Sequence, residues 1–191
     1  MGSARPAGRH FQPFPGVWEA IAGGVICPAK YLIPETNGLT DAQMRSIQDP
    51  MARRDIVARV ERVSSDSERQ WGQMDVSQML AHAADQLRIA VGDINVDRAR
   101  GPFQFAPMRY LMVHVLPWPK GKAQAPHEAL TTAPTDLEED RATLVALIDR
   151  FATTPPSDVA PLHPLFGRMT ARDWGVFSYR HLDHHLRQFS A

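Results

Sequence analysis

The sequence predicts an all-α protein: an up-and-down four-helix bundle at 49–191 that follows an irregular N-terminal extension at 1–48. Four stretches repeat apolar residues at the spacing of one helix face, and each begins with a residue that caps helix N-termini. No stretch alternates apolar and polar residues as a half-buried strand would. Hydrophobic residues make up 43% of the 191, which is enough to build a substantial core.

The N-terminal extension is expected to lack regular structure, because its prolines and glycines recur too closely for a helical or strand pattern. Its mildly apolar part, 16–27, is interrupted by Glu19, which argues against a secretory signal. Met44 and Met51 offer alternative translation starts, so the alternative that the extension lies upstream of the true start stays open.

The first two helices are defined by their ends. Asp49 is a good N-cap and Pro50 suits the first helical position, so the first helix is expected at about 50–63. The second is expected from Asp75, which has a glutamine three residues later as in a capping box, to Gly92. Its apolar face consists of Val76, Met79, Leu80, Ala83, Leu87 and Ala90.

The chain between the second and third helices has weaker patterns. The apolar run at 108–116 is short enough to be either a helix or a strand. Prolines and glycines then recur over 117–134, which predicts a long surface loop.

Capping boxes also open the last two helices. Thr135 and Glu138 form the box of the third helix, which is expected to end before a pair of prolines at 155–156. Thr170 and Asp173 form the box of the fourth helix.

The fourth helix carries three histidines on different sides. At about 100° per residue, His181 and His185 face its apolar side, whereas His184 lies at the edge against the charged side. His82 lies at the flank of the second helix's apolar face. Imidazoles at i and i+4 can reach one ion, and a third from a neighbouring helix would leave a coordination position open. The three residues His82, His181 and His185 thus predict a zinc, nickel or iron(II) site, although hydrogen-bonded core histidines would also fit the pattern.

Several residues near the predicted ligands could orient them or line a pocket. These candidates are Gln86, Asp85, His184, Gln188 and Trp174. Trp71 and Trp174 are most simply hydrophobic anchors, with a pocket wall as the alternative. His163, which precedes a proline, is expected to cap a loop, and His114 to be structural.

Charge and cysteine content argue against several classes of function. The formal net charge is zero, so neither nucleic acid nor an anionic membrane is expected as a partner. The single cysteine, Cys27, permits no intramolecular disulfide and fits a reducing compartment such as the cytoplasm. No apolar run is long enough for a transmembrane helix.

Three segments together resemble the bacterial DinB-like (YfiT-like) metalloenzyme superfamily, and in particular a subfamily of unknown function. They are 71–82, which contains His82; 163–174; and 181–188, which contains the HxxxH pair. The resemblance covers roughly 50–191 and implies a four-helix bundle with a divalent metal held by His82, His181 and His185. Some members of the superfamily are transferases or isomerases that use a low-molecular-weight thiol. Many have no assigned reaction, so the resemblance does not fix the chemistry.

The sequence therefore favours a metal-dependent enzyme, either a thiol-dependent transferase or isomerase or a hydrolase, that acts on a small molecule. The alternative is a non-catalytic bundle, of a binding or stress-related kind, in which the ion only stabilises the fold. The sequence is silent on dimerisation, although relatives often pair and a homodimer stays an open alternative.

Overall fold

The structure is a computed structural model, and it describes residues 45–97, 101–121, 130–154 and 162–191. The predicted extension therefore lies outside the described residues, apart from its last four. All described residues fall within one structural unit, Glu35–Ala191.

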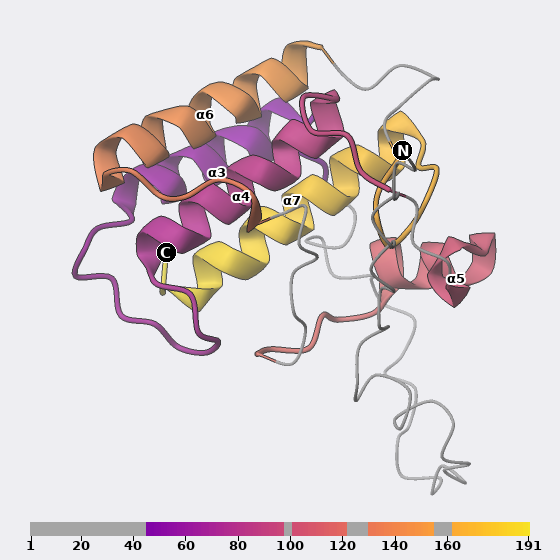
Figure 1. The fold of residues 1–191 in the computed structure, drawn as a ribbon, viewed down its shortest axis with the longest axis horizontal. Helices are drawn as coiled ribbons and strands as arrows, with labels where there is room; N and C mark the ends of the chain where they lie inside the picture. Colours follow the sequence, from indigo (N-terminus) through magenta and orange to yellow (C-terminus); the bar gives the residue numbers. More distant parts are fainter. Residues whose placement is uncertain (1–44, 98–100, 122–129, 155–161) are drawn as a thin grey trace, which may run out of the picture. The chain divides into compact units, whose positions relative to one another are not determined.

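Four long helices dominate this unit: α3 (Pro50–Arg62), α4 (Val76–Val91), α6 (Leu137–Thr153) and α7 (Ala171–Gln188) (Figure 1). A short helix, α5 (Ala106–Tyr110), continues directly into a π-helical turn at Leu111–Val115 and follows a 3-10 turn at Pro102–Gln104. The described residues contain no β-strand, only an isolated bridge between His163 and Gly167. The predicted all-α fold is thus confirmed.

The four long helices form a closed ring in which α3 and α4 each pack against both α6 and α7. Helix directions follow from pairs of bonded residues. Asp93, just beyond the end of α4, bonds Arg150 near the end of α6, so these two helices are parallel. His82 of α4 lies against His181 of α7, and Gln86, one turn later in α4, pairs with Ser178, which comes earlier in α7, so these two helices are antiparallel.

Consecutive helices in the chain are therefore not always neighbours in the ring. The connection at 92–136 is long enough to return the chain so that α6 starts at the same end as α4. The sequence predicted an up-and-down bundle. In the structure α6 runs parallel to α4, and α7 packs beside α4 and not beside α6.

Most of the predicted helix ends are confirmed by their capping bonds. Asp49 caps α3, Asp75 opens α4 with a full capping box, and Thr170 and Asp173 form the box of α7. Gly92 ends α4 with a φ of 88°, a left-handed conformation that glycine adopts at no steric cost.

The start of α6 corrects one prediction. Its N-cap is Asp136, which accepts from the backbone of Glu138 and Glu139, and not Thr135. Thr135 instead donates to the carboxylate of Asp140 at 3.0 Å. Both Thr135 and Asp136 suit an N-cap, and the sequence pattern does not say which of two adjacent residues leaves the helical conformation first.

The packed part of the chain begins before Asp49. Ile47 is fully buried, and its backbone N–H donates to the carbonyl of Gly175 at 3.0 Å. A Cβ on Gly175 would lie 2.3 Å from the Oγ of Ser46, so only glycine admits this close approach between the entering chain and α7. Residues 45–48, predicted to belong to the extension, are irregular but are packed on the bundle.

The run at 108–116 is helical, which settles the choice between helix and strand. Pro107 sits in the first turn of α5, where its missing N–H costs nothing. At the other end, Arg180 of α7 donates to the carbonyls of Met112, Val113 and Leu116. This side chain satisfies carbonyls that the end of a helix leaves without a partner.

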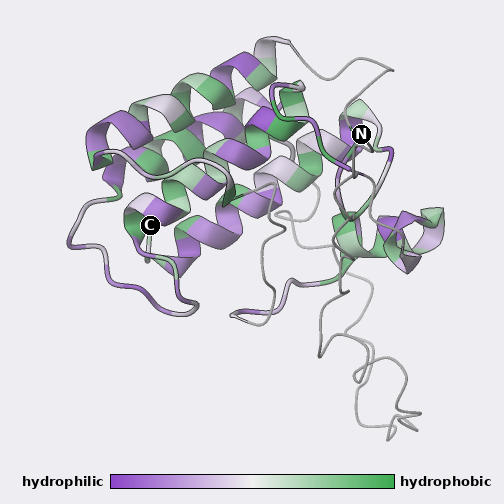
Figure 2. Ribbon diagram, viewed as in Figure 1, coloured by the Kyte–Doolittle hydropathy of each residue, from purple (hydrophilic) through white to green (hydrophobic). Residues whose placement is uncertain are grey.

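The core lies inside the ring and is formed by the apolar faces predicted from periodicity. All six residues of the predicted α4 face are buried, and Leu144, Leu147, Ile148 and Phe151 are buried on α6. Apolar and polar stretches alternate along each long helix, as amphipathic helices require (Figure 2). No helix among the described residues has the length and apolar character needed to cross a membrane.

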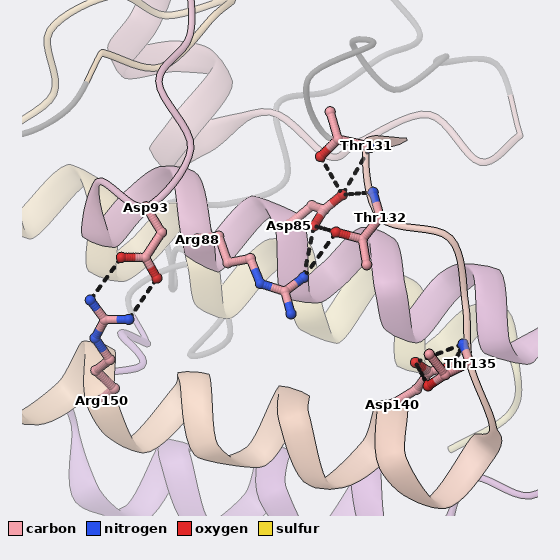
Figure 3. Close-up of polar contacts among 8 residues, drawn as sticks. All are labelled: Asp85, Arg88, Asp93, Thr131, Thr132, Thr135, Asp140 and Arg150. Carbon is pink, nitrogen blue, oxygen red and sulfur yellow. Dashed lines mark hydrogen bonds and ion pairs between the residues drawn. The ribbon is translucent and has the colours of Figure 1, made fainter.

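Buried polar bonds hold the segment before α6 against α4 (Figure 3). Asp85, fully buried, accepts from the backbone N–H and the hydroxyl of both Thr131 and Thr132, and from Arg88 at 2.8 Å. Burial raises the pKa of Asp85, but these hydrogen bonds outweigh burial and lower the pKa below its usual 3.8. The carboxylate is therefore ionised near neutral pH and anchors this connection.

Replacing Asp85 with alanine should lower the free energy of unfolding by about 3 kcal/mol, because it removes the buried carboxylate that accepts from Thr131, Thr132 and Arg88. Urea denaturation measures the loss. The matched control is Asp93→Ala, which removes an exposed ion pair with Arg150 and should cost far less. Equal losses in the two variants would contradict the anchoring role.

Candidate metal centre

The three predicted ligands meet at the contact between α4 and α7. His82 comes from the middle of α4, and His181 and His185 lie one turn apart on α7. The centres of the three rings are 4.6 to 4.9 Å apart. The residues are 4%, 9% and 8% exposed, so three polar rings share a nearly dry position in the core.

The spacing of the ring nitrogens suits a single metal ion. The Nε2 atoms of His82 and His181 are 3.1 Å apart, and one nitrogen from each of the three residues lies within 4.8 Å of the others. Two histidine nitrogens bound at about 2.1 Å to one ion can be at most about 4.2 Å apart. The first pair already satisfies this limit, and small ring rotations would bring in the third.

The two predicted ligands on α7, His181 and His185, are held in the uncharged form that binds metals. Burial lowers the pKa of His185 to about 3, and the neighbouring His82 adds to the effect. Burial also lowers the pKa of His181 well below 6.5, helped by His185 and His82. A neutral imidazole keeps a nitrogen lone pair free for an ion.

A hydrogen-bonded chain fixes which nitrogen of His185 faces the cluster. The carbonyl of Trp71 can only accept, so the Gln188 nitrogen that lies 2.7 Å from it must donate. The amide oxygen of Gln188 is then left for Nδ1 of His185, 2.9 Å away, which must carry the proton. Nε2 of His185 is therefore unprotonated and available as a ligand.

The approach of the Trp71 segment to Gln188 depends on a glycine. Gly72 has a φ of 79°, and a Cβ on it would lie 2.6 Å from the amide nitrogen of Gln188. Any larger residue would displace the amide that orients His185. Gln188, predicted as a supporting residue, thus lies beside the cluster and bonds one of its rings.

Gln86 also lies at the contact between α4 and α7 but bonds no ring of the cluster. Its nitrogen is 3.4 Å from the hydroxyl of Ser178, and its buried oxygen has no partner among the described residues. Nδ1 of His181 is likewise buried without a partner in the described part of the chain. The contact between α4 and α7 therefore contains buried polar atoms that have no hydrogen-bond partner among the described residues.

Two other candidates lie away from the three rings. Both oxygens of Asp85 accept from the segment before α6 and from Arg88, so Asp85 does not orient a cluster histidine. Trp174 is fully buried and packs on His163 and Phe177, which makes it a core residue.

The remaining histidines occupy distinct positions. His184 is half-buried and lies 5.3 Å from His185, between Trp71 and Trp118. His163 caps a turn, because its Nδ1 accepts from the backbone of the two residues that follow Pro164. His114 bonds Asp173 at 2.7 Å and thereby ties the π-helical turn to the start of α7.

Sequence reasoning missed Trp118 and Lys120, which lie beside His184 and Trp71. Trp118 is 6.1 Å from His181 between ring centres, and the Lys120 ammonium is 4.5 Å from the centre of the Trp71 ring. Both residues belong to the predicted loop at 117–134, where no periodicity assigns a side chain to a face. The lone aromatic residue in that loop was the only available signal.

Comparison with known proteins identifies a family but no function. Residues 44–191 match the family model DUF1569, which is described as a protein of unknown function, and the chain belongs to this family. No curated protein and no solved structure matches the chain.

Replacing Gln188 with leucine should weaken metal binding by about tenfold to a hundredfold, because His185 loses the acceptor that fixes its orientation. Competition with a chelator of known affinity measures the change. Gln86→Leu is the matched control, since its amide bonds Ser178 and no imidazole, and it should change affinity much less. Wild-type affinity in Gln188→Leu would contradict the orienting role.

His163 should make the fold sensitive to acid. Burial lowers its pKa to about 3 in the folded chain, against 6.5 when exposed, so below pH 6.5 the unfolded state takes up a proton that the folded state rejects. The free energy of unfolding should therefore fall as the pH drops from about 6.5 towards 3, with this residue contributing up to about 1.4 kcal/mol per pH unit.

The variant His163→Asn tests this contribution. Its amide oxygen can accept from the same backbone N–H groups but does not titrate. Urea denaturation between pH 7 and 4, with a chelator present, should show a shallower loss of stability than in the wild type. Parallel curves would refute the assignment.

Proposed function

We propose that this DUF1569-family protein is a metal-dependent enzyme whose divalent zinc, nickel or iron ion is held by His82, His181 and His185. One observation carries the proposal: three imidazoles from two helices converge in the core with ring nitrogens as close as 3.1 Å. Burying polar rings together is costly unless a partner compensates them, and a shared ion is the partner that this donor set suits.

The number of protein ligands supports a reactive site over a purely structural one. In the described part of the chain, no cysteine, aspartate, glutamate or fourth histidine belongs to the group. Structural zinc sites usually have four protein ligands, whereas catalytic sites keep a position for water or substrate. A bound ion would lower the pKa of a water or thiol in that position and polarise a substrate carbonyl.

The chain's own residues would prepare the site. Gln188 orients Nε2 of His185 towards the ion, and the link to the Trp71 carbonyl keeps that amide from rotating. Phe177 stacks on His181 at 5.6 Å and limits the positions of that ring. These contacts reduce the reorganisation that metal binding requires.

The reaction class follows from the resemblance to the DinB-like superfamily, which supports a transferase or isomerase that uses a small thiol, or a hydrolase. The second candidate is a non-catalytic bundle, and one observation favours it. The ligands come from both α4 and α7, so an ion would link the two helices and add directly to stability.

Metal analysis of protein purified without a histidine tag tests the proposal. About one zinc, nickel or iron ion per chain is expected, and His185→Ala and His82→Ala should lose it. His184→Ala is the matched control, because His184 is adjacent in the chain but outside the three-residue group, and it should retain the metal.

Activity then separates the two candidates. Turnover of thiol-dependent, ester or amide substrates that is present in the wild type and lost in His185→Ala supports the enzyme. A large fall in melting temperature on chelation without any turnover supports the structural ion. Protein that binds no metal under any condition refutes both.

A further inference from the structure

The side of the histidine cluster that leads to solvent is framed by flat rings. Trp71, Trp118 and His184, here called the aromatic frame, are all partly exposed. The His184 ring lies 5.7 Å from Trp71 and 6.1 Å from Trp118. Because His184 also lies 5.3 Å from His185, the frame borders the proposed metal site directly.

Two connecting segments build the frame and contact each other. Trp71 belongs to the segment before α4, and Trp118 to the segment after the π-helical turn. A Cβ on Gly121 would lie 3.6 Å from the backbone nitrogen of Gly72, so the two segments pass at van der Waals distance. The amide of Gln188 donates to the backbone carbonyl of Trp71, and the indole of Trp118 donates to the carbonyl of Met112 at 2.9 Å. These two hydrogen bonds fix the positions of the two tryptophans.

A positively charged side chain lies over the ring face of each of the two tryptophans. The Arg180 guanidinium lies 5.1 Å from the Trp118 ring centre, but it is already committed to three backbone carbonyls. The exposed Lys120 ammonium lies 4.5 Å from the Trp71 ring centre, and no carboxylate among the described residues pairs with it. Asp183, the acidic neighbour of His184, is engaged by Arg59 and Arg187.

The frame also contains an unused donor. Nε1 of Trp71 is buried and has no acceptor within the described ranges. Apart from the His184 ring, which has ring contacts only, this region thus offers two donors with no acceptor in the described part of the chain: one ammonium and one indole N–H. Such a set suits an anion, and a planar carboxylate with two oxygens matches two donors better than a phosphate, which needs more.

We propose that Trp71, Trp118, His184 and Lys120 form a subsite for a small carboxylate with an aromatic or apolar body. The body stacks within the aromatic frame and the carboxylate pairs with Lys120. The inference rests on the proposed function in one respect: a ligand held there would present its remaining groups to the metal bound by the three histidines. Binding at the subsite itself requires no metal.

Binding of phenylacetate, compared with its uncharged isostere phenylacetamide, tests the subsite. Titrations of the full chain use the indole N–H signals of 15N-labelled protein, with chelator and again with added zinc. Phenylacetate should bind about tenfold more tightly than phenylacetamide in both conditions, as expected for one charge-assisted hydrogen bond. The signals of Trp71 and Trp118 should shift together.

Variants of Lys120 test whether this residue causes the preference for phenylacetate over phenylacetamide. Lys120→Gln should abolish the preference for phenylacetate over phenylacetamide, and Lys120→Arg should restore it. Arg54→Gln, which removes an exposed cation on α3, is the matched control and should keep the preference. Trp71→Leu should weaken both ligands, because it removes a stacking face.

The outcomes separate this inference from the metal site. Phenylacetate binding that requires zinc and is unchanged in Lys120→Gln overturns the subsite, because the ion then holds the carboxylate, and leaves the proposed function intact. Equal binding of the two probes also overturns the subsite. Lys120-dependent binding in a protein that takes up no metal supports the subsite and refutes the metal centre.

Discussion

The burial of three imidazoles between α4 and α7 is the constraint on which the rest of the site depends. His82, His181 and His185 occupy positions where apolar side chains would pack without penalty. Placing polar rings there costs free energy unless each ring nitrogen has a partner. The fold supplies part of this compensation through Gln188, and one nitrogen from each of the three rings lies within 4.8 Å of the others.

Holding that point requires a fixed register between two antiparallel helices. The capping boxes at Asp75 and Thr170 determine where α4 and α7 begin. Gly175 lets the entering chain bond α7 directly, and Arg59 of α3 bonds Asp183 near the histidines at 2.7 Å. A shift of α7 by one turn would break these contacts and separate His181 from His82.

Much of this arrangement could be predicted from local patterns. Periodicity gave the faces of α4 and α7, and the i and i+4 spacing separated the inward His181 and His185 from His184. The pattern could not rank the supporting residues, because a residue's position on a helix face does not show which groups it will hydrogen-bond. Gln188 and Asp85 were both candidates, yet Gln188 orients a ring whereas Asp85 anchors a distant segment.

The features that could not be predicted depend on long-range packing of irregular chain. Trp118 and Lys120 reach the site because the π-helical turn at Leu111–Val115 packs on α7, where Arg180 binds carbonyls that precede them. The same connection makes α6 parallel to α4. Loop sequences carry turn preferences but no periodicity, so they do not reveal which elements they will contact.

Buried polar atoms in this fold differ in how completely hydrogen bonds satisfy them. Asp85, Arg180 and Asp173 are buried or half-buried, and their charges are matched by several hydrogen bonds each. Among the described residues, three buried atoms without partners lie at or beside the histidine cluster: Nδ1 of His181, Oε1 of Gln86 and Nε1 of Trp71. Nε1 of Trp174 and Nε of Arg141 are also buried without partners in the described part of the chain, and they lie away from the three rings. Native structures leave few such atoms, and three of them lie together here, beside the three imidazoles. The metal ion and the small carboxylate proposed above would bring to this part of the chain partners that its own described residues do not supply.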